Sequence, residues 1–474
     1  MQAPSFWQRL SLQTADEAVA RGFEKSLLLA PLRAPLQGLK SRLQPWVASS
    51  YTQTILPYLA VFSTLLLLFA LPFVSSGQSA LLVLACSAIT FLRVIFIQER
   101  YALGSLVLSV CVFVGWGLVA SGFSPFLKLS LYGYAKSLTY FLCYLCFLVN
   151  LRDAKAMRGS LWAIALSAII VSLYGLYQWH IKVPPLALWD DPDSTNFTLT
   201  RVYSFLGNPN LLGGYLLPTL SFTIFFAFNR PWWGRILLAF AALVQIACIY
   251  FTYSRGAWIA LVALVATGFL CFLMLFWHRI GKSKAVKTLL FAGVVVMVLG
   301  VLGFVLTNPA LLERVRSLSS TEHSSNNFRI NVWRSSLEMI QVYGLTGIGM
   351  GNKVFVKMYT YYMATGFRAL STYNIFLEIW LEMGLLGFLI FLGMLSLHAL
   401  RCVWGFFSSG AMAFRLMLAG AFCASAALLV HGMVDTVFFR PPVQILFWYA
   451  LALITLASRQ LAVATDDVAP TETE

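Results

Sequence analysis

Three stretches of the sequence decide how this chain is organised: HSSNNFRINVWRSSLEMI at residues 323–340, GLTGIGMGN at 344–352 and STYNIFLEIWLEMGLLG at 371–387. The first two lie in a mixed polar segment, residues 308–372, and long apolar runs lie on either side of it. Apolar residues at helical spacing predict a short helix from about Asn327 to Gly344. Ile330, Trp333, Leu337 and Ile340 fall on one stripe of this predicted helix.

A second short helix is predicted from Asn352 to Gly366, with Phe355, Tyr359 and Tyr362 on its apolar face. Basic residues outnumber acidic ones across 308–372. The segment is therefore predicted to form an external, anion-facing cap on a membrane bundle.

Composition sets the class of protein. The chain has 474 residues, of which 59% are hydrophobic and only 11% are charged, whereas soluble domains carry about 25% charged residues. A chain this apolar must cover its surface with lipid, so we predict an all-α polytopic membrane protein in a bilayer. Most of the basic residues behind the net charge of +15 fall in short loops, where membrane topology accounts for them, and nucleic-acid binding is not expected.

A spanning helix needs about 20 mostly apolar residues. Twelve such runs are predicted, at 55–74, 79–97, 101–120, 129–149, 159–179, 209–228, 232–253, 256–277, 288–307, 373–398, 415–438 and 443–458. The gaps that would face inward are basic, which predicts cytoplasmic N- and C-termini. The two long loops, 180–208 and 308–372, are then external.

This topology divides the chain into five parts. They are a cytoplasmic or interfacial segment (1–54), nine spans (55–307), the large external loop (308–372), three spans (373–458) and a disordered acidic tail (459–474).

Ionisable side chains inside a membrane are costly and are candidates for function. In the predicted topology six of them gather toward the external face: Lys136, Arg255, Glu378, Glu382, His431 and Asp435. Each also has a structural interpretation. His431 and Asp435 are spaced to pair within one helix, and Glu378 and Glu382 are placed to neutralise Lys136 or Arg255.

Arginine suits bidentate contact with carboxylate, phosphate or bicarbonate-like anions. Arg255 lies in a tight Tyr-Ser-Arg-Gly corner, and Arg201, Arg329 and Arg334 approach from the external loops to complete an anion clamp. Asn208 or Asn210 is expected to cap the sixth span. The eight cysteines lie mostly within apolar runs, and neither a metal site nor a cofactor is expected.

Several strings carry a resemblance to a known family. GNPNLLGGYLLP (207–218), TYSRGAW (252–258), the loop with FRINVW and GIGMGN, and the span after STYN resemble the O-antigen ligase and polymerase (WaaL/Wzy) superfamily of membrane proteins. Within it, SSNNFRINVW and RVYSFLGNPNLL resemble the cyanobacterial IctB-type proteins, which are named as bicarbonate transporters.

The resemblance implies roles for particular residues. Ligases of the superfamily transfer a glycan from a polyprenyl-diphosphate carrier, hold the diphosphate with external arginines and use a histidine in an HNxxLxxxxxxG motif as the base. Arg255 matches the arginine of the ligase SRG string, and Arg329 is a looser match. Asn374, Leu377 and Gly384 match the motif, but Tyr373 occupies the histidine position. A tyrosine, with a pKa near 10, is a poor base at neutral pH, so this difference argues against ligase chemistry.

Three functions follow from these observations. The IctB resemblance implies inorganic-carbon accumulation or bicarbonate transport in a cyanobacterial plasma or thylakoid membrane, with an external site for a small anion. The alternative is a glycosyltransferase acting on a lipid-linked diphosphate sugar, in which Tyr373, His323 or His431 replaces the missing base. The third is a non-catalytic membrane scaffold.

Overall fold

The computed structural model describes residues 12–25, 51–97, 104–184, 200–276 and 324–466, with a few isolated positions between them. These residues form helices joined by turns, and none of them lies in a β-strand. The predicted all-α class is therefore confirmed.

Ten of the described helices are long and apolar enough to cross a membrane. They are α4 (Thr52–Ala70), α5 (Ser76–Phe96), α6 (Ser105–Gly122), α8 (Ala154–His180), α9 (Pro209–Ala227), α10 (Trp232–Phe251), α11 (Arg255–Leu275), α17 (Ile375–Phe407), α18 (Met412–Gly432) and α19 (Pro441–Asp466). The run predicted at 129–149 is also helical, as α7 (Leu127–Asn150), but it is not among the ten. All but the first residue of the run at 288–307 lies outside the described residues, so the total of twelve stays a prediction.

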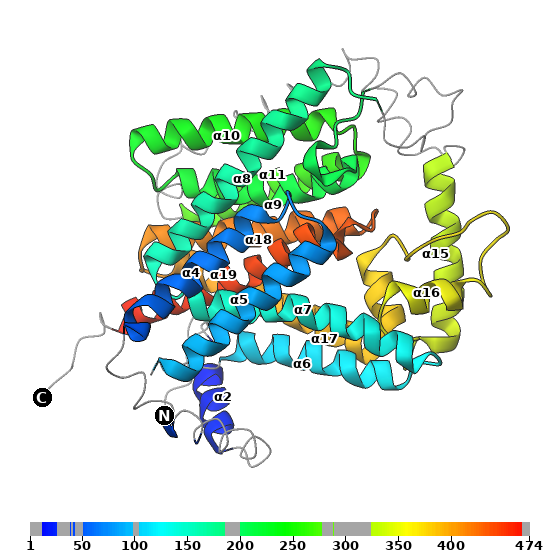
Figure 1. Ribbon diagram of the computed structural model, residues 1–474, viewed down its shortest axis with the longest axis horizontal. Helices are drawn as coiled ribbons and strands as arrows, with labels where there is room; N and C mark the ends of the chain where they lie inside the picture. Colours follow the sequence, from blue (N-terminus) through cyan, green and yellow to red (C-terminus); the bar gives the residue numbers. More distant parts are fainter. Residues whose placement is uncertain are drawn as a thin grey trace, which may run out of the picture.

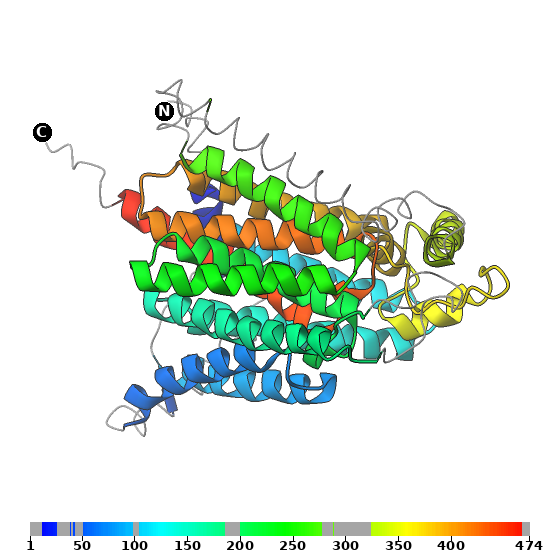
Figure 2. The ribbon, with the colours of Figure 1, turned by 90° about the horizontal axis from the view of Figure 1, so that it is seen from above.

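The long helices run side by side as one bundle (Figure 1). Its centre is formed by α9, α18 and α19, because α18 packs against α9, α11 and α19, and α19 also packs against α7. The pair α4 and α5 forms one edge of the bundle (Figure 2). The end that carries α15 (Ser324–Tyr343) and α16 (Asn352–Tyr359) is called the loop end, and the end that carries α2 (Gln13–Lys25) and the last turns of α19 is called the tail end.

Polar residues cap several helices at the loop end. Asn208 accepts hydrogen bonds from the amides of Asn210 and Leu211 and so caps α9, and Pro209 occupies the first turn, where its missing N–H costs nothing. Ser254 caps α11, and Asn374 caps α17. Each cap satisfies backbone donors that lipid cannot satisfy.

The helices of the large loop differ in detail from the prediction. In α15 the side chains of Val332, Met339 and Ile340 are buried, whereas Ile330 and Leu337 are exposed. The apolar stripe therefore coincides only in part with the buried face of the helix, which also includes Ser336, whose hydroxyl donates to the Val332 carbonyl. In α16 the predicted Phe355 and Tyr359 are buried, but the helix ends at Tyr359, before Gly366.

The C-terminal helix is longer than predicted. α19 continues through Asp466, so the tail predicted to be disordered from residue 459 is helical in its first part. Leu461 is fully buried and lies close to Gly405 and Gly410 of the α17–α18 corner. This contact gives the added turns an apolar surface to pack against.

The N-terminal helix α2 is joined to the tail end by one carboxylate. Asp16 Oδ1 accepts hydrogen bonds from the amide and the hydroxyl of Ser105, both at 2.7 Å, and so caps α6 from outside. Asp16 Oδ2 accepts from Arg401 Nη2 at 2.6 Å. The side chain of Arg401 is only 4% exposed, and its Nε and Nη1 have no hydrogen-bond partner among the described residues. Asp16 is therefore the main compensation for a buried guanidinium.

Substitution of Asp16 tests how much this carboxylate contributes to the stability of the fold. We expect Asp16→Ala to lower the free energy of unfolding by about 2–3 kcal/mol, because it leaves a buried charge and a helix N-terminus unsatisfied. Glu17→Ala changes the exposed neighbour on α2 and should have little effect. Thermal unfolding of the full-length protein in detergent measures both, and equal transition temperatures for the two variants would contradict the assignment.

Candidate functional site

A partly open cavity of about 1280 Å³ lies at the loop end. Its walls come from the N-terminal turns of α5, α7, α9, α17 and α19, the C-terminal part of α6, the start of α15 and the segments 350–353 and 368–373. Parts of both predicted external loops therefore meet here. Six basic and three acidic residues line it: Lys136, Arg201, Arg329, Lys353, Arg368 and Arg440, and Glu378, Glu382 and Asp435.

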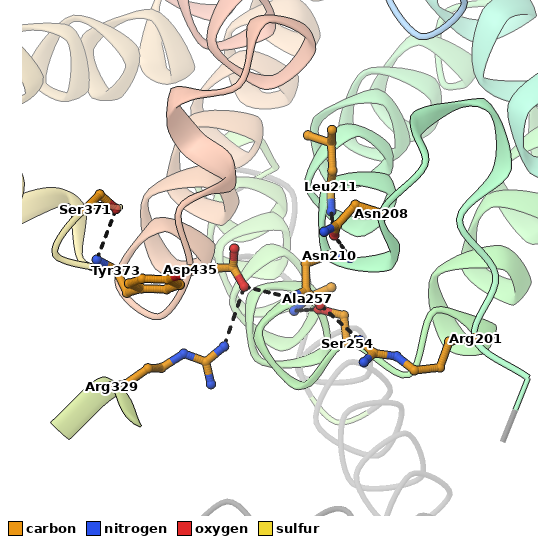
Figure 3. A network of polar contacts seen from close by, with 10 residues as sticks. All are labelled: Arg201, Asn208, Asn210, Leu211, Ser254, Ala257, Arg329, Ser371, Tyr373 and Asp435. Atoms are coloured by element: carbon orange, nitrogen blue, oxygen red, sulfur yellow. Dashed lines mark hydrogen bonds and ion pairs between the residues drawn. The ribbon is translucent and has the colours of Figure 1, made fainter. Parts of the chain in front are cut away.

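A chain of polar contacts crosses the cavity wall (Figure 3). Arg201 Nη2 donates to Asn210 Oδ1 at 3.2 Å, and Asn210 Nδ2 donates to Asp435 Oδ2 at 2.8 Å. The same oxygen of Asp435 lies 3.5 Å from Arg329 Nη2. One carboxylate thus joins the segment after α8, the start of α9, the α18–α19 connection and the large loop.

Asn208 and Asn210 have different structural roles. Asn208 is the helix cap, as the sequence allowed, and this leaves the side chain of Asn210 to bridge Arg201 and Asp435. Arg201 is also fixed by its Nε, which donates to the carbonyl of Thr252 in the corner that precedes α11. This contact attaches the Tyr-Ser-Arg-Gly corner to the network.

Helix α17 is broken where it borders the cavity. Gly384 has φ 71° and ψ −179°, a conformation open to glycine alone. The carbonyls of Leu381 and Glu382 accept from the amides of Ile348 and Gly349, and the Met383 carbonyl accepts from the Trp116 indole at 2.9 Å. The stretch GLTGIGMGN therefore completes the hydrogen bonding of a broken helix, which gives its glycines a structural role.

The two glutamates of α17 accept hydrogen bonds from backbone amides of the large loop. Glu378 Oε2 accepts from the Thr372 amide at 2.6 Å, and Glu382 Oε1 accepts from the Gly351 amide at 2.7 Å. Both side chains are buried. The hydrogen bonds that these carboxylates accept come from backbone amides, which fix the loop on either side of α16, and not from Lys136 or Arg255 as expected from the sequence.

Tyr373 lies where the ligase resemblance places a histidine. It has φ 56°, its ring packs edge-on against Phe328 with centroids 5.3 Å apart, and it lines the cavity beside Asp435 (Figure 3). Burial raises the pKa of the Tyr373 phenol, and the Asp435 carboxylate acts in the same direction. The phenol therefore keeps its proton at neutral pH, so it can donate a hydrogen bond but cannot act as a base.

The structure brings together most, but not all, of the candidate residues. Lys136, Arg201, Arg329, Tyr373, Glu378, Glu382 and Asp435 line the one cavity. Arg255, Arg334, Asn374 and His431 are not among the lining residues. Arg255 occupies the first turn of α11, and Arg334 lies exposed on α15. The loop histidine, His323, lies outside the described residues.

His431 does not form the predicted pair with Asp435 within one helix. α18 ends at Gly432, so Asp435 lies in the connection beyond it and binds Asn210 and Arg329. The imidazole of His431 is fully buried, close to Gly214 and Gly256, and neither ring nitrogen has a hydrogen-bond partner among the described residues. Its place beneath the network favours a packing role over contact with a ligand.

Three cationic residues of the cavity were not selected from the sequence. Lys353, Arg368 and Arg440 all line it, but the sequence places them among many basic loop residues. The sequence feature that could have identified them is their position at the ends of predicted helices in the external loops. Among the described residues, no group of three histidine, cysteine or acidic side chains is placed to hold a metal ion.

The fold and the cavity define a polytopic helical membrane protein with a basic site at one end of its bundle. Residues 238–392, from within α10 to within α17, match a family described as O-Antigen ligase. The matched part is about a third of the chain and supplies Arg329, Tyr373, Glu378 and Glu382 to the cavity. A search of curated proteins found no match. The match and the helical fold support an O-antigen-ligase-like membrane protein.

The helix break offers a sharp test of the site's construction. A Cβ at Gly384 would lie 2.3 Å from the Leu345 carbonyl oxygen, so we expect Gly384→Ala to destabilise the protein by at least about 2 kcal/mol. Gly393, two turns later in α17, has open space around it, and Gly393→Ala should be neutral or slightly stabilising. A thermal-shift assay in detergent compares them, and a mild effect at Gly384 would mean that the break is not required.

Proposed function

We propose that this protein binds a polyprenyl-diphosphate-linked saccharide in the cavity at the loop end, on the external face of the membrane. The proposal rests on a large cavity in which basic side chains outnumber acidic ones. Its volume of about 1280 Å³ exceeds the 300–1,000 Å³ that is usual for drug-sized ligands. Such a volume suits a diphosphate with attached sugars and part of a hydrocarbon chain.

The acidic side chains in the cavity are already engaged. Asp435 is held by Asn210 and Arg329, and both glutamates accept backbone amides. The six basic side chains exceed them in number, so the cavity has an excess of positive charge for a polyanion. Guanidinium groups bind phosphate oxygens in bidentate fashion, which favours Arg329, Arg201 and Arg440 as the diphosphate contacts.

Phenylalanine and tryptophan side chains line the same cavity next to the charges. Phe113, Phe391, Phe447 and Trp448 are among them. An amphipathic ligand with a charged head and a hydrocarbon chain satisfies both surfaces at once, whereas a small inorganic anion uses only the basic part. Bicarbonate transport and the IctB-type assignment therefore stay predictions from resemblance, as does the non-catalytic scaffold.

Transfer of the saccharide is a separate step from binding. Tyr373 keeps its proton and His431 lies outside the cavity wall, so neither supplies the base that ligase chemistry would use. We propose recognition of the lipid-linked diphosphate as the function that the site supports best. The Tyr373 phenol would then donate a hydrogen bond to a phosphate oxygen.

Two arginines of α15 provide the test. Arg329 lines the cavity, and Arg334, little more than one helical turn away, is exposed and does not. With the purified protein in zwitterionic nanodiscs, we expect Arg329→Gln to weaken binding of undecaprenyl diphosphate at least tenfold, which corresponds to about 1.4 kcal/mol. Arg334→Gln should bind like the unmodified protein.

One further measurement separates transport from binding of a lipid-linked diphosphate. Uptake of labelled bicarbonate into proteoliposomes, if it were lost in the Arg329 variant and kept in the Arg334 variant, would favour transport. Absence of undecaprenyl diphosphate binding, or an equal loss in both variants, would overturn the proposal.

A further inference from the structure

A group of hydrogen-bond donors converges at the tail end, where α6 begins. The amide and the hydroxyl of Ser105 both donate to Asp16 Oδ1 at 2.7 Å, and Arg401 Nη2 donates to Asp16 Oδ2 at 2.6 Å. A helix N-terminus, a hydroxyl and a guanidinium are donors that proteins commonly use to bind phosphate. In this structure the anion that they hold is a carboxylate of the chain itself.

Gly104, directly before the first turn of α6, lets that anion approach the backbone closely. Its φ of −121° and ψ of 175° are open to any residue, so the backbone conformation does not require glycine. The space does require it, because a Cβ at this position would lie 2.9 Å from Asp16 Oδ1. We call Gly104, Ser105 and Arg401 together the α6 cradle.

Asp16 uses only part of the donor capacity of the α6 cradle. The side chain of Arg401 is 4% exposed, and its Nε and Nη1 are buried without a hydrogen-bond partner in the part of the chain that the structure describes. The guanidinium lies 5.1 Å from the centroid of the Trp404 ring, a contact that restrains its orientation. The charge of Arg459 in α19 also acts on both Arg401 and Asp16. A phosphate offers more acceptor oxygens than a carboxylate and suits this excess of donors.

The α6 cradle lies where spanning helices leave the apolar core of the membrane. Ser105 is the first residue of α6, and Arg401 lies less than two turns before the end of α17 at Phe407. Basic pockets between spanning helices at this level bind the phosphates of anionic lipids, and soluble phosphate reaches the same level from the water. Asp16 is supplied by α2, outside the spans, and its side chain is 27% exposed, so a competing anion can reach it.

We propose that the α6 cradle is a binding site for a phosphate group and that Asp16 closes it as an intramolecular competitor. An entering phosphate takes the place of the Asp16 carboxylate, accepts from the amide and hydroxyl of Ser105, and gives the remaining nitrogens of Arg401 an acceptor. The carboxylate then turns to water, and α2 is released from α6, the helix against which it packs. The site lies at the opposite end of the bundle from the cavity, so this proposal does not depend on the function proposed there.

Asp16→Ala tests the site directly, because it removes the competitor and leaves the space of its carboxylate open. The full-length protein is unfolded by heat in phosphatidylcholine nanodiscs, with sodium phosphate or with sodium chloride at the same ionic strength. We expect phosphate to raise the transition temperature of Asp16→Ala by at least about 3 °C more than that of the unmodified protein. In a second arm, phosphatidylglycerol replaces part of the phosphatidylcholine in sodium chloride alone, which tests a lipid headgroup as the source of the phosphate.

Matched variants identify the contacts. Glu17→Ala removes the exposed acidic neighbour on α2 and should respond to phosphate like the unmodified protein. Arg401→Gln, combined with Asp16→Ala, should lose the added response, and Ser105→Ala in the same background should weaken it. An equal rise in every variant would mean that phosphate acts only as a stabilising salt. That result, or no response to either phosphate source, overturns the proposal.

Hydrogen exchange in the unmodified protein tests the competition. The phosphate source that stabilises Asp16→Ala should speed exchange in α2 at least about threefold. The first amides of α6 should stay protected, because the phosphate replaces Asp16 as their acceptor. Unchanged exchange in α2, or faster exchange in both helices, overturns the proposal. Rescue by phosphatidylglycerol alone identifies a lipid headgroup as the ligand, whereas rescue by phosphate in phosphatidylcholine identifies a soluble phosphate, and both results support the site.

Discussion

The loop end depends on the hydrogen bonds at the break in α17, where carbonyl groups of the helix accept from donors outside it. At Gly384 the helix gives up its own bonding pattern, and the carbonyls of Leu381, Glu382 and Met383 find donors in the loop 344–349 and in Trp116. An unsatisfied carbonyl inside a bilayer costs several kcal/mol. The break is therefore stable only while the loop is in place, and the loop is held in place by the break.

The consequence of this arrangement is a fixed cavity wall. Because the loop is bonded to α17, Gly351 lies within reach of the Glu382 carboxylate, and α16 starts from that point. α16 then carries Lys353 toward Tyr132 of α7, and Glu378 holds Thr372 on the other side of the loop. The positions of charged residues far apart in sequence thus follow from a few backbone hydrogen bonds.

This dependence explains which features could be predicted from the sequence. Apolar runs predict the spans because each helix satisfies its own backbone, and the gathering of Lys136, Glu378 and Asp435 at one end follows from counting spans. The pairing of Asp435 with Asn210 and Arg329 could not be predicted. It requires α18 to end at Gly432 and three distant segments to meet, and helical spacing alone favours His431 as the partner.

The resemblance to ligases can be examined in the same physical terms. Asn374 caps α17 and Gly384 provides its break, so these two anchors of the motif have structural roles whatever the chemistry of the site. Tyr373 precedes the cap in a left-handed conformation that directs its side chain into the cavity. The helix cap and the break fix the direction of the side chain at this position but leave its chemistry open. The cap and the break can therefore be kept whichever side chain stands between Thr372 and Asn374.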